Sequence, residues 1–265
     1  MSSGKIALAA SMIGLAQKQS SIANNLANMQ SPAFKGKVGS FAAIMRNDLA
    51  GGQASSFPMP VYCESSNFSQ GDMVNTHNKL DVAINGKGFF KIKRADGEIA
   101  FTRSGSFQTD REGYLTTPTG DQVLQDTGEP IQLNSGDLHD LVIDEKGELK
   151  IMDLAEGKTT VIGRLGVFRF VLPREATGKP EDTDMNHRVV PIGGGLYQAP
   201  TERGVVAWED RRTTLTQGAL ERSNIDSAQE LVRMLLVERT FEACGRTLRL
   251  VGQAHSAFMA IAKQG

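Results

Sequence analysis

The chain has 265 residues, 40% of them hydrophobic, with 29 basic and 30 acidic side chains and a formal net charge of −1. This length corresponds to one large domain or two modest ones, and the near-neutral balance argues against a general nucleic-acid binder. No run of about 18 uncharged apolar residues occurs, so no transmembrane helix is expected. The two cysteines, Cys63 and Cys244, lack metal-binding spacing and cannot form a disulfide framework.

The N-terminal segment has the apolar spacing of a helix that packs against another helix. Apolar side chains recur every seven residues, which predicts a helix from about residue 5 to about residue 30, ending before Pro32. The start of the chain lacks the continuous apolar core of a signal peptide, so an ordinary amphipathic helix is favoured. The apolar stripe comprises Leu8, Leu15, Ile22, Leu26 and Met29.

The middle of the chain has the pattern of a loop followed by short strands. Residues 51–78 are rich in glycine, serine and proline and are predicted to form an extended connector. From Leu80 the apolar period becomes two, and turn signals such as Asn85-Gly86 separate the apolar runs. The spacing predicts an antiparallel sandwich or distorted barrel. Its strands are expected at 80–84, 89–92, 99–102, 114–117, 141–143, 148–151 and 163–172, followed by a long loop over 173–195.

The C-terminal segment carries the strongest helical pattern. Two apolar series, each with a period of seven and offset by three, run over more than three heptads. Ser227 and Glu230 fit a capping box, which predicts a helix from near Asp226 to about Ala262, about 55 Å long. So long a stripe needs another helix to cover it. The stripe comprises Met234, Val237, Phe241, Cys244, Leu248, Val251 and Phe258.

These elements predict an α+β protein, in which long N- and C-terminal helices form a coiled-coil-like pair and flank a central antiparallel β-rich domain. The expected boundaries are 1–50 and 211–265 for the two helical halves, 51–78 for the connector and 79–210 for the β-rich domain. The charge distribution favours this division, because residues 1–48 hold five basic side chains and one acidic one. The middle of the chain is net negative.

Side chains typical of catalysis or metal binding do not cluster in the sequence. The four histidines are isolated from one another, and no phosphate-binding loop or G-x-S-x-G elbow occurs. We therefore expect no enzyme activity, no catalytic or cofactor-binding residues and no metal site. Two alternatives stay open: a hydrolase with a cleft near Asp81 or Asp110, and a secreted adhesin-like binding module with coiled-coil arms.

Three segments, in order along the chain, resemble the bacterial flagellar basal-body rod protein family. They are residues 23–35, residues 80–90 continued by 101–107, and residues 217–226. Ala33 occupies a position at which this family usually has glycine. The residues that match the family motifs are Asn24, Asn25, Leu26, Ala27, Asn28, Phe34, Lys35, Gly86, Gly88, Phe89, Phe90, Gly218, Leu220, Ser223 and Asn224.

The resemblance implies a structural subunit without catalytic function. In this family the terminal helices pair and line a central tube, and subunits join head to tail into an axial drive shaft that transmits torque and carries the export channel. Here the two apolar stripes would form the helical seam, partly within one subunit and partly between neighbours. Residues 163–168 and 195–197 favour a proximal, F-type rod protein; a distal, G-type rod protein or a hook-type axial subunit is the alternative.

The resemblance also implies partners and a location. The expected partners are copies of the chain, other proximal and distal rod subunits and the flagellar type III export apparatus. No nucleic acid, small-molecule substrate, cofactor or direct membrane span is expected. The expected location is the basal-body rod, which spans the periplasm, after export without a cleaved signal peptide.

Overall fold

The computed structural model describes residues 3–48, 55–133, 140–153, 158–171, 189–199, 206–209 and 213–262. The chain divides into two compact units. The helical unit comprises Met1–Met29, Gly36–Asn67 and Ile225–Gly265, and the β unit comprises Gln30–Lys35 and Phe68–Asn224. Among the described residues, neither helix has an apolar stretch that could cross a membrane.

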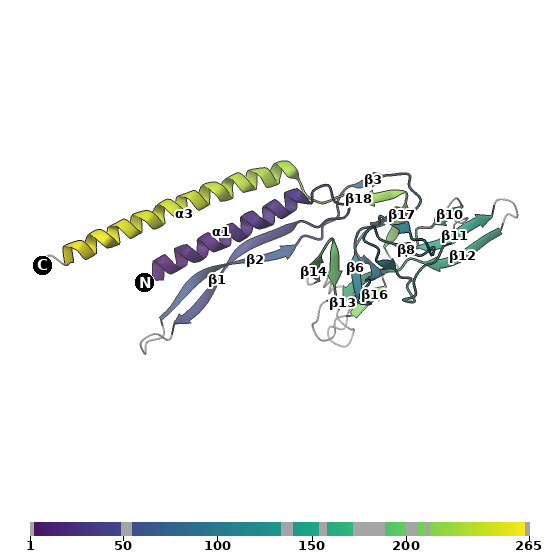
Figure 1. Cartoon of the computed structure of the whole chain (residues 1–265), viewed down its shortest axis with the longest axis horizontal. Helices are drawn as coiled ribbons and strands as arrows, with labels where there is room; N and C mark the ends of the chain where they lie inside the picture. The colour runs from purple at the N-terminus through teal and green to yellow at the C-terminus, as the bar shows by residue number, and fades with distance from the viewer. Residues whose placement is uncertain are drawn as a thin grey trace. The chain divides into compact units, whose positions relative to one another are not determined.

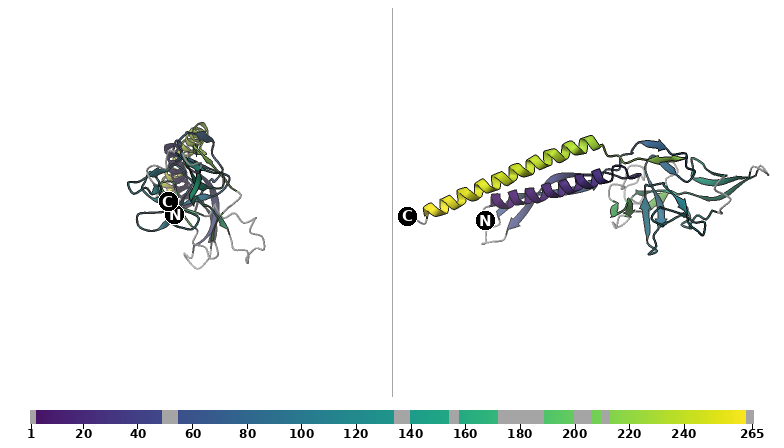
Figure 2. Two further views of the ribbon diagram at one scale, coloured as in Figure 1. Left: turned by 90° about the vertical axis from the view of Figure 1, so that its right-hand side faces the viewer. Right: turned by 45° about the horizontal axis from the view of Figure 1, so that its top comes forward.

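The helical unit contains one helix from each end of the chain and a long hairpin between them in sequence. Helix α1 covers Ser3–Ala27 and helix α3 covers Ser227–Ala262. The hairpin consists of β1 (Lys37–Asp48) and β2 (Ser55–Ser66). Within this unit, α1 lies between α3 and the hairpin (Figure 1; Figure 2). The predicted α+β class, with a helix at each end, is confirmed.

Asp226 caps the N-terminus of α3, and this corrects the predicted capping box. Its side-chain Oδ1 accepts hydrogen bonds from the backbone N–H groups of Ala228 and Gln229, at 2.9 and 3.3 Å. A carboxylate in this position satisfies N–H groups that have no partner within the helix. The Glu230 side chain pairs instead with Arg233, at 2.6 Å. Asp226 therefore has the role that the sequence analysis gave to Ser227.

The β1–β2 hairpin was not predicted from the sequence. The strands pair antiparallel from Lys37 opposite Ser66 to Asp48 opposite Ser55, so β2 lies within the range expected to be a connector. Pro58 and Pro60 belong to β2. Proline has no N–H to donate and is therefore confined to edge strands, and β2 pairs only with β1 among the described residues. The two prolines fit a strand with one free edge.

The β unit is built from short antiparallel strands, as the period-two pattern predicted. Its largest sheet has the path β14-β15-β6-β5-β9-β8-β7, with β13 joining β5 to β16, and β10-β11-β12 form a separate sheet. The strands are β3 (Met73–Asn75), β4 (Val82–Asn85), β5 (Phe89–Lys93), β6 (Ile99–Thr102), β7 (Gln108–Thr109), β8 (Leu115–Thr116), β9 (Gln122–Val123), β10 (Leu141–Ile143), β11 (Glu148–Asp153), β12 (Lys158–Arg164), β13 (Val167–Val171), β14 (Val190–Gly193), β15 (Leu196–Gln198), β16 (Val206–Glu209), β17 (Thr214–Gln217) and β18 (Ala219–Glu221).

Two predicted segments differ in detail from the structure. The strand expected over 163–172 is divided, because β12 ends at Arg164 and β13 begins at Val167. The loop expected over 173–195 lies mostly outside the described residues. Its last part forms β14 and the turn to β15, in which Gly193, Gly194 and Gly195 all have positive φ.

Two apolar clusters form the core of the β unit. Phe90 lies in the larger cluster, with residues of β4, β8, β10 and β11, and Phe89 lies in an aromatic cluster with Phe101, Phe170 and Tyr197. Successive side chains of a strand point to opposite faces of the sheet, so Phe89 and Phe90 belong to different clusters. Strands β17 and β18 close the unit by pairing with β4 and β3.

Candidate subunit interface

An apolar cluster includes side chains of both α1 and α3. Leu15, Ile22 and Val237 are its buried members. Leu26, Met234, Phe241 and Cys244 pack against them, and all seven belong to the stripes identified in the sequence. Of the other stripe residues, Leu8 and Leu248 are half-buried and Met29 and Val251 are 36% and 40% exposed. The Phe258 side chain lies outside the described part of the chain.

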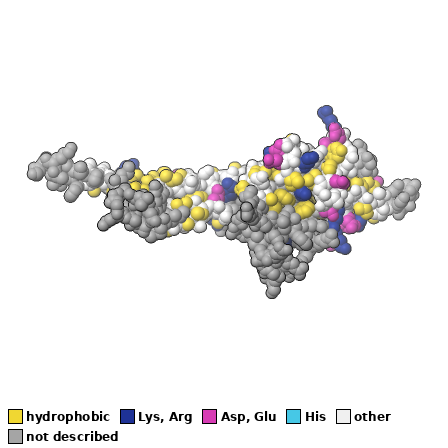
Figure 3. All heavy atoms as spheres, turned by 90° about the horizontal axis from the view of Figure 1, so that it is seen from below, with side chains coloured by type: hydrophobic (Ala, Val, Ile, Leu, Met, Phe, Trp, Pro, Cys, Tyr) yellow, Lys and Arg dark blue, Asp and Glu magenta, His cyan; other side chains and the backbone are white. Residues whose placement is uncertain are grey.

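Helix α3 also has an apolar surface that the sequence analysis did not identify. Leu231, Val232, Leu235 and Leu236 are 53–60% exposed, and we call them the outer apolar face. Their spacing places them together on the side of the helix opposite Val237. Contiguous exposed apolar side chains mark interaction sites in soluble proteins. Further hydrophobic side chains are exposed on the surfaces of both units (Figure 3).

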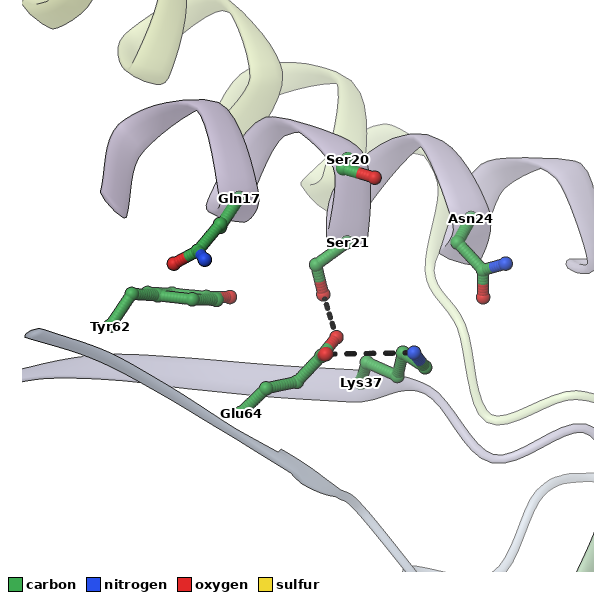
Figure 4. Close-up of a pocket in the computed structure, with 7 residues that line it drawn as sticks. All are labelled: Gln17, Ser20, Ser21, Asn24, Lys37, Tyr62 and Glu64. Carbon is green, nitrogen blue, oxygen red and sulfur yellow. Dashed lines mark hydrogen bonds and ion pairs between the residues drawn. The ribbon is translucent and has the colours of Figure 1, made fainter. Parts of the chain in front are cut away.

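A polar cavity lies between α1 and the hairpin. It has a volume of about 320 Å³ and polar walls from both elements (Figure 4). Ser21 donates a hydrogen bond to Glu64 at 2.7 Å, and the Lys37 Nζ lies 3.5 Å from the other oxygen of that carboxylate. Burial raises the pKa of Tyr62, which also lines the cavity. The other lining residues are Gln17, Ser20 and Asn24.

Asn25 binds the first residue of the hairpin through both ends of its side-chain amide. Its Nδ2 donates to the Lys37 carbonyl at 2.9 Å, and its Oδ1 accepts from the Lys37 N–H at 2.8 Å. A side-chain amide carries the same donor and acceptor as a peptide group, so Asn25 pairs with β1 as a neighbouring strand would. At the end of α1, Asn28 donates to the carbonyl of Asn24 at 2.9 Å. These contacts give two of the motif asparagines a structural role.

Glu221 lies at the centre of a buried ionic cluster in the β unit. Its carboxylate is 2.5 Å from the Lys35 Nζ and 2.7 Å from the Arg103 Nε, and it accepts a further hydrogen bond from the Gly71 N–H at 2.8 Å. The three charged side chains are 1–5% exposed. We call Lys35, Arg103 and Glu221 the Glu221 cluster. Lys35 also donates to the carbonyl of Ser69 at 2.8 Å.

Arg103 holds the turn between β4 and β5. Its guanidinium donates to the carbonyls of Ile84, Gly86 and Gly88. Gly88 has a φ of 135°, and a Cβ there would lie 2.4 Å from Cγ1 of Val167. Only glycine combines this backbone conformation with so close a neighbour. The motif glycines Gly86 and Gly218 also have positive φ.

Ala33 and several motif residues lie beside the Glu221 cluster. Ala33 has a φ of 54° and donates its N–H to the Glu221 carbonyl at 2.7 Å. Asn224 donates from its side chain to Ser69 at 3.0 Å and from its backbone to the Phe34 carbonyl at 3.4 Å. These bonds hold residues 33–35 against residues 221–224. Of the remaining motif residues, Ala27 is exposed, Leu220 and Ser223 are half-buried, and Leu220 pairs with Val74.

The carboxylates considered for a hydrolase both stabilise turns. Asp81 accepts a hydrogen bond from the Thr76 hydroxyl at 2.7 Å, and Asp110 accepts from the N–H groups of Glu112 and Tyr114. Both cysteines are free thiols. In the described part of the chain, no three histidine, cysteine, aspartate or glutamate side chains are grouped as a metal site would require.

Sequence reasoning missed Arg103 and Glu221 as site residues. Both stand in segments that resemble the family, but neither was singled out. The available signal was a charged residue at the end of a short apolar run, as Arg103 directly after 99–102 and Glu221 directly after 219–220. A charge in such a position is rarely buried without a partner.

Comparison with known proteins places these features in a family. Residues 83–151 match the flagellar hook protein FlgE/F/G D1 domain, and residues 216–251 match the flagellar basal body rod FlgEFG protein C-terminal region. The chain is 30% identical over 230 residues to the flagellar basal-body rod protein FlgF of Caulobacter vibrioides, covering 86% of this chain and 84% of the relative. The chain belongs to the flagellar basal-body rod protein family.

Other members of the rod family are similar over nearly the same length. The FlgG rod protein of Buchnera aphidicola subsp. Schizaphis graminum is 29% identical, with 88% of this chain and 89% of the relative covered. The FlgG rod protein of Bacillus subtilis is also 29% identical, with 84% of each chain covered. The three matching segments identified in the sequence therefore reflect membership of the rod family.

Proposed function

We propose that this chain is a structural subunit of the flagellar basal-body rod that assembles head to tail with copies of itself and with other axial proteins. The family supports a structural role in the basal body. The rod family is not known for enzymatic activity. Head-to-tail contacts join two different surfaces of each copy and therefore build open polymers.

The outer apolar face is the observation that carries this proposal. Leu231, Val232, Leu235 and Leu236 are each more than half exposed. Covering such a side chain completely is worth about 1.5–3 kcal/mol relative to leaving it in water. The apolar cluster with α1 occupies the opposite side of α3, so this face is free to bind a neighbouring subunit while that cluster stays intact.

The helical seam and the division of the chain into an axial core and an outer domain are parts of the same proposal. We propose that α1 and α3 form a coiled-coil-like pair whose stripes make the helical seam, and that the ends of the stripes extend it between subunits. The helical unit, including the β1–β2 hairpin, whose second strand lies within the predicted connector 51–78, would supply the axial core, and the β unit would be the outer domain. The half-buried Leu8 and Leu248 and the partly exposed Met29 and Val251 are suited to contacts between copies.

We further propose a proximal, F-type position in the rod, with a distal, G-type position as the alternative. The subunit would pass through the flagellar type III export apparatus without a cleaved signal peptide and assemble in the periplasm. Its axis would transmit torque and enclose the export channel. The identity to the FlgF relative supports the F-type assignment, and the similar identities to FlgG relatives support the alternative.

The test is Leu235→Asp in a strain that lacks the chromosomal gene. The variant places a charge on the outer apolar face but leaves the cluster with α1 untouched. We expect normal levels of folded protein, loss of the variant from isolated basal bodies and loss of swimming. Val161→Asp, at an apolar side chain of β12 that is 56% exposed on the β unit, is the matched control and should assemble normally. Normal incorporation of Leu235→Asp would contradict the proposed interface.

A further inference from the structure

We propose that the Glu221 cluster couples the two connections of the β unit, so that the N-terminal connection can lock in place only when the C-terminal connection is docked. The N-terminal connection is Gln30–Lys35, which follows α1 in sequence. The C-terminal connection is the segment from β18 to Asn224, which precedes α3. This inference concerns folding of the subunit and is independent of the proposed function.

The charge count of the cluster makes Glu221 indispensable to the other two members. Lys35 and Arg103 are 2% and 5% exposed, and both pair with the same carboxylate. Burying a cation without a partner is strongly unfavourable, and removing one member of a buried ion pair leaves such a charge. Without Glu221, Lys35 would therefore leave its buried position, and the connection that carries it would detach.

The coupling spans most of the chain. Lys35 and Glu221 are 186 residues apart, and Arg103 and Glu221 are 118 residues apart. Since a chain is made from its N-terminus, Lys35 and Arg103 are present long before Glu221. The β unit therefore stays open at this point until β17 and β18 have paired with β4 and β3, which brings Glu221 into place.

Backbone hydrogen bonds alone could hold each connection in place separately. The experiment must therefore measure hydrogen exchange at the connection that does not carry the substitution. The Phe34 N–H bonds the Ser31 carbonyl at 3.3 Å, within the N-terminal connection, and reports on that connection. The Arg222 N–H bonds the Asp72 carbonyl at 2.8 Å and reports on the C-terminal connection. Neither N–H bonds to a side chain of the Glu221 cluster, so a substitution in the cluster removes neither bond directly.

The test is amide hydrogen exchange in the full chain for Glu221→Ala and Lys35→Met. We expect Glu221→Ala to speed exchange at Phe34 by about tenfold or more, whereas Lys35→Met leaves Glu221 paired with Arg103 and should leave exchange at Arg222 nearly unchanged. Acceleration at Arg222 without acceleration at Phe34 in Glu221→Ala would overturn the coupling. Glu221→Gln keeps the size of the side chain and removes its charge, so it carries the test if Glu221→Ala does not fold.

The Asp144, Glu148 and Lys150 network provides the matched control. Lys150 pairs with both carboxylates, at 2.7 and 2.9 Å, but these side chains are 28–40% exposed. Exposed ion pairs contribute little to stability. Glu148→Ala should therefore leave exchange at Phe34 and Arg222 unchanged. A change equal to that in Glu221→Ala would show a general loss of stability and would refute the specific coupling.

Discussion

Glu221 is a buried carboxylate that two neighbouring cations keep ionised. Burial acts to raise its pKa, but the charge of Arg103 and the hydrogen bond and charge of Lys35 outweigh burial, so the pKa of Glu221 lies below its ordinary value of 4.5. Burial raises the pKa of the nearby Tyr197 to about 12, so this phenol stays neutral beside the cluster. A lowered carboxylate pKa means that ionised Glu221 stabilises the folded state.

This ionisation predicts a pH dependence for the stability of the β unit. The contribution of Glu221 is complete above a pH of about 4.5 and is lost as the pH falls through the lower folded-state pKa. Glu221→Gln removes it, so the difference in free energy of unfolding between wild type and variant should shrink below that pH. Urea denaturation at a series of pH values measures the difference. A difference that does not change with pH would contradict the assignment.

Ala33 stands in a backbone conformation that favours glycine. Its φ of 54° lies in the left-handed region, which glycine adopts at no steric cost. The left-handed conformation costs an L-residue about 1–2 kcal/mol, and glycine at this position would avoid that cost. The greater freedom of glycine in the unfolded chain offsets about 0.4–1 kcal/mol of this advantage.

Ala33→Gly should therefore stabilise the β unit by about 0.5–1 kcal/mol, measured by chemical denaturation. Ala23→Gly, at an exposed position of α1, is the opposite control and should destabilise its helix by about 1 kcal/mol. If both substitutions destabilise the protein equally, the conformation assigned to Ala33 is wrong.

At the scale of the element, α1 is shaped to accept the hairpin. A Cβ at Gly14 would lie 2.5 Å from Cε1 of Phe41, so the absence of a side chain lets the ring of β1 approach the helix. Phe41 also contacts Tyr62 of β2 edge to face, with 5.6 Å between ring centroids. Glycine at position 14 lowers the helix propensity of α1, but the absence of a side chain there allows Phe41 to contact the helix.

A double-mutant cycle tests this contact. In a Phe41→Ala background, Gly14→Ala should stabilise α1 by about 1 kcal/mol, because only helix propensity changes. With Phe41 present, the added methyl group displaces the ring, and the gain should be lost. Thermal unfolding followed by circular dichroism measures both effects. An equal effect of Gly14→Ala in the two backgrounds would exclude the close packing.

The same elements show what sequence alone can predict. From residue 227 onward, apolar side chains recur at the spacing of a helix. The two ends of α3 were therefore predicted to within about one residue. The hairpin depends on pairing between residues up to about 30 apart, and the glycine, serine and proline of 51–60 resemble a loop. Pairing of Lys35 with Glu221 depends on the completed fold, so no local pattern could reveal it.

At the scale of the whole molecule, the chain combines a self-contained β unit with helices that expose apolar surface. The β unit has two buried apolar clusters of its own, whereas the outer apolar face of α3 remains exposed. A stable monomer seldom keeps such a surface uncovered. This contrast, together with membership of the rod family, is the basis for assigning a structural role in a polymer.

The most direct test is to locate the wild-type chain in isolated hook–basal bodies by quantitative mass spectrometry, together with electron microscopy of the same particles from a deletion strain. If the chain is a rod subunit, it will copurify with the rod, and the deletion strain will lack complete rods. Complete rods in the deletion strain, or absence of the chain from wild-type basal bodies, would contradict the account.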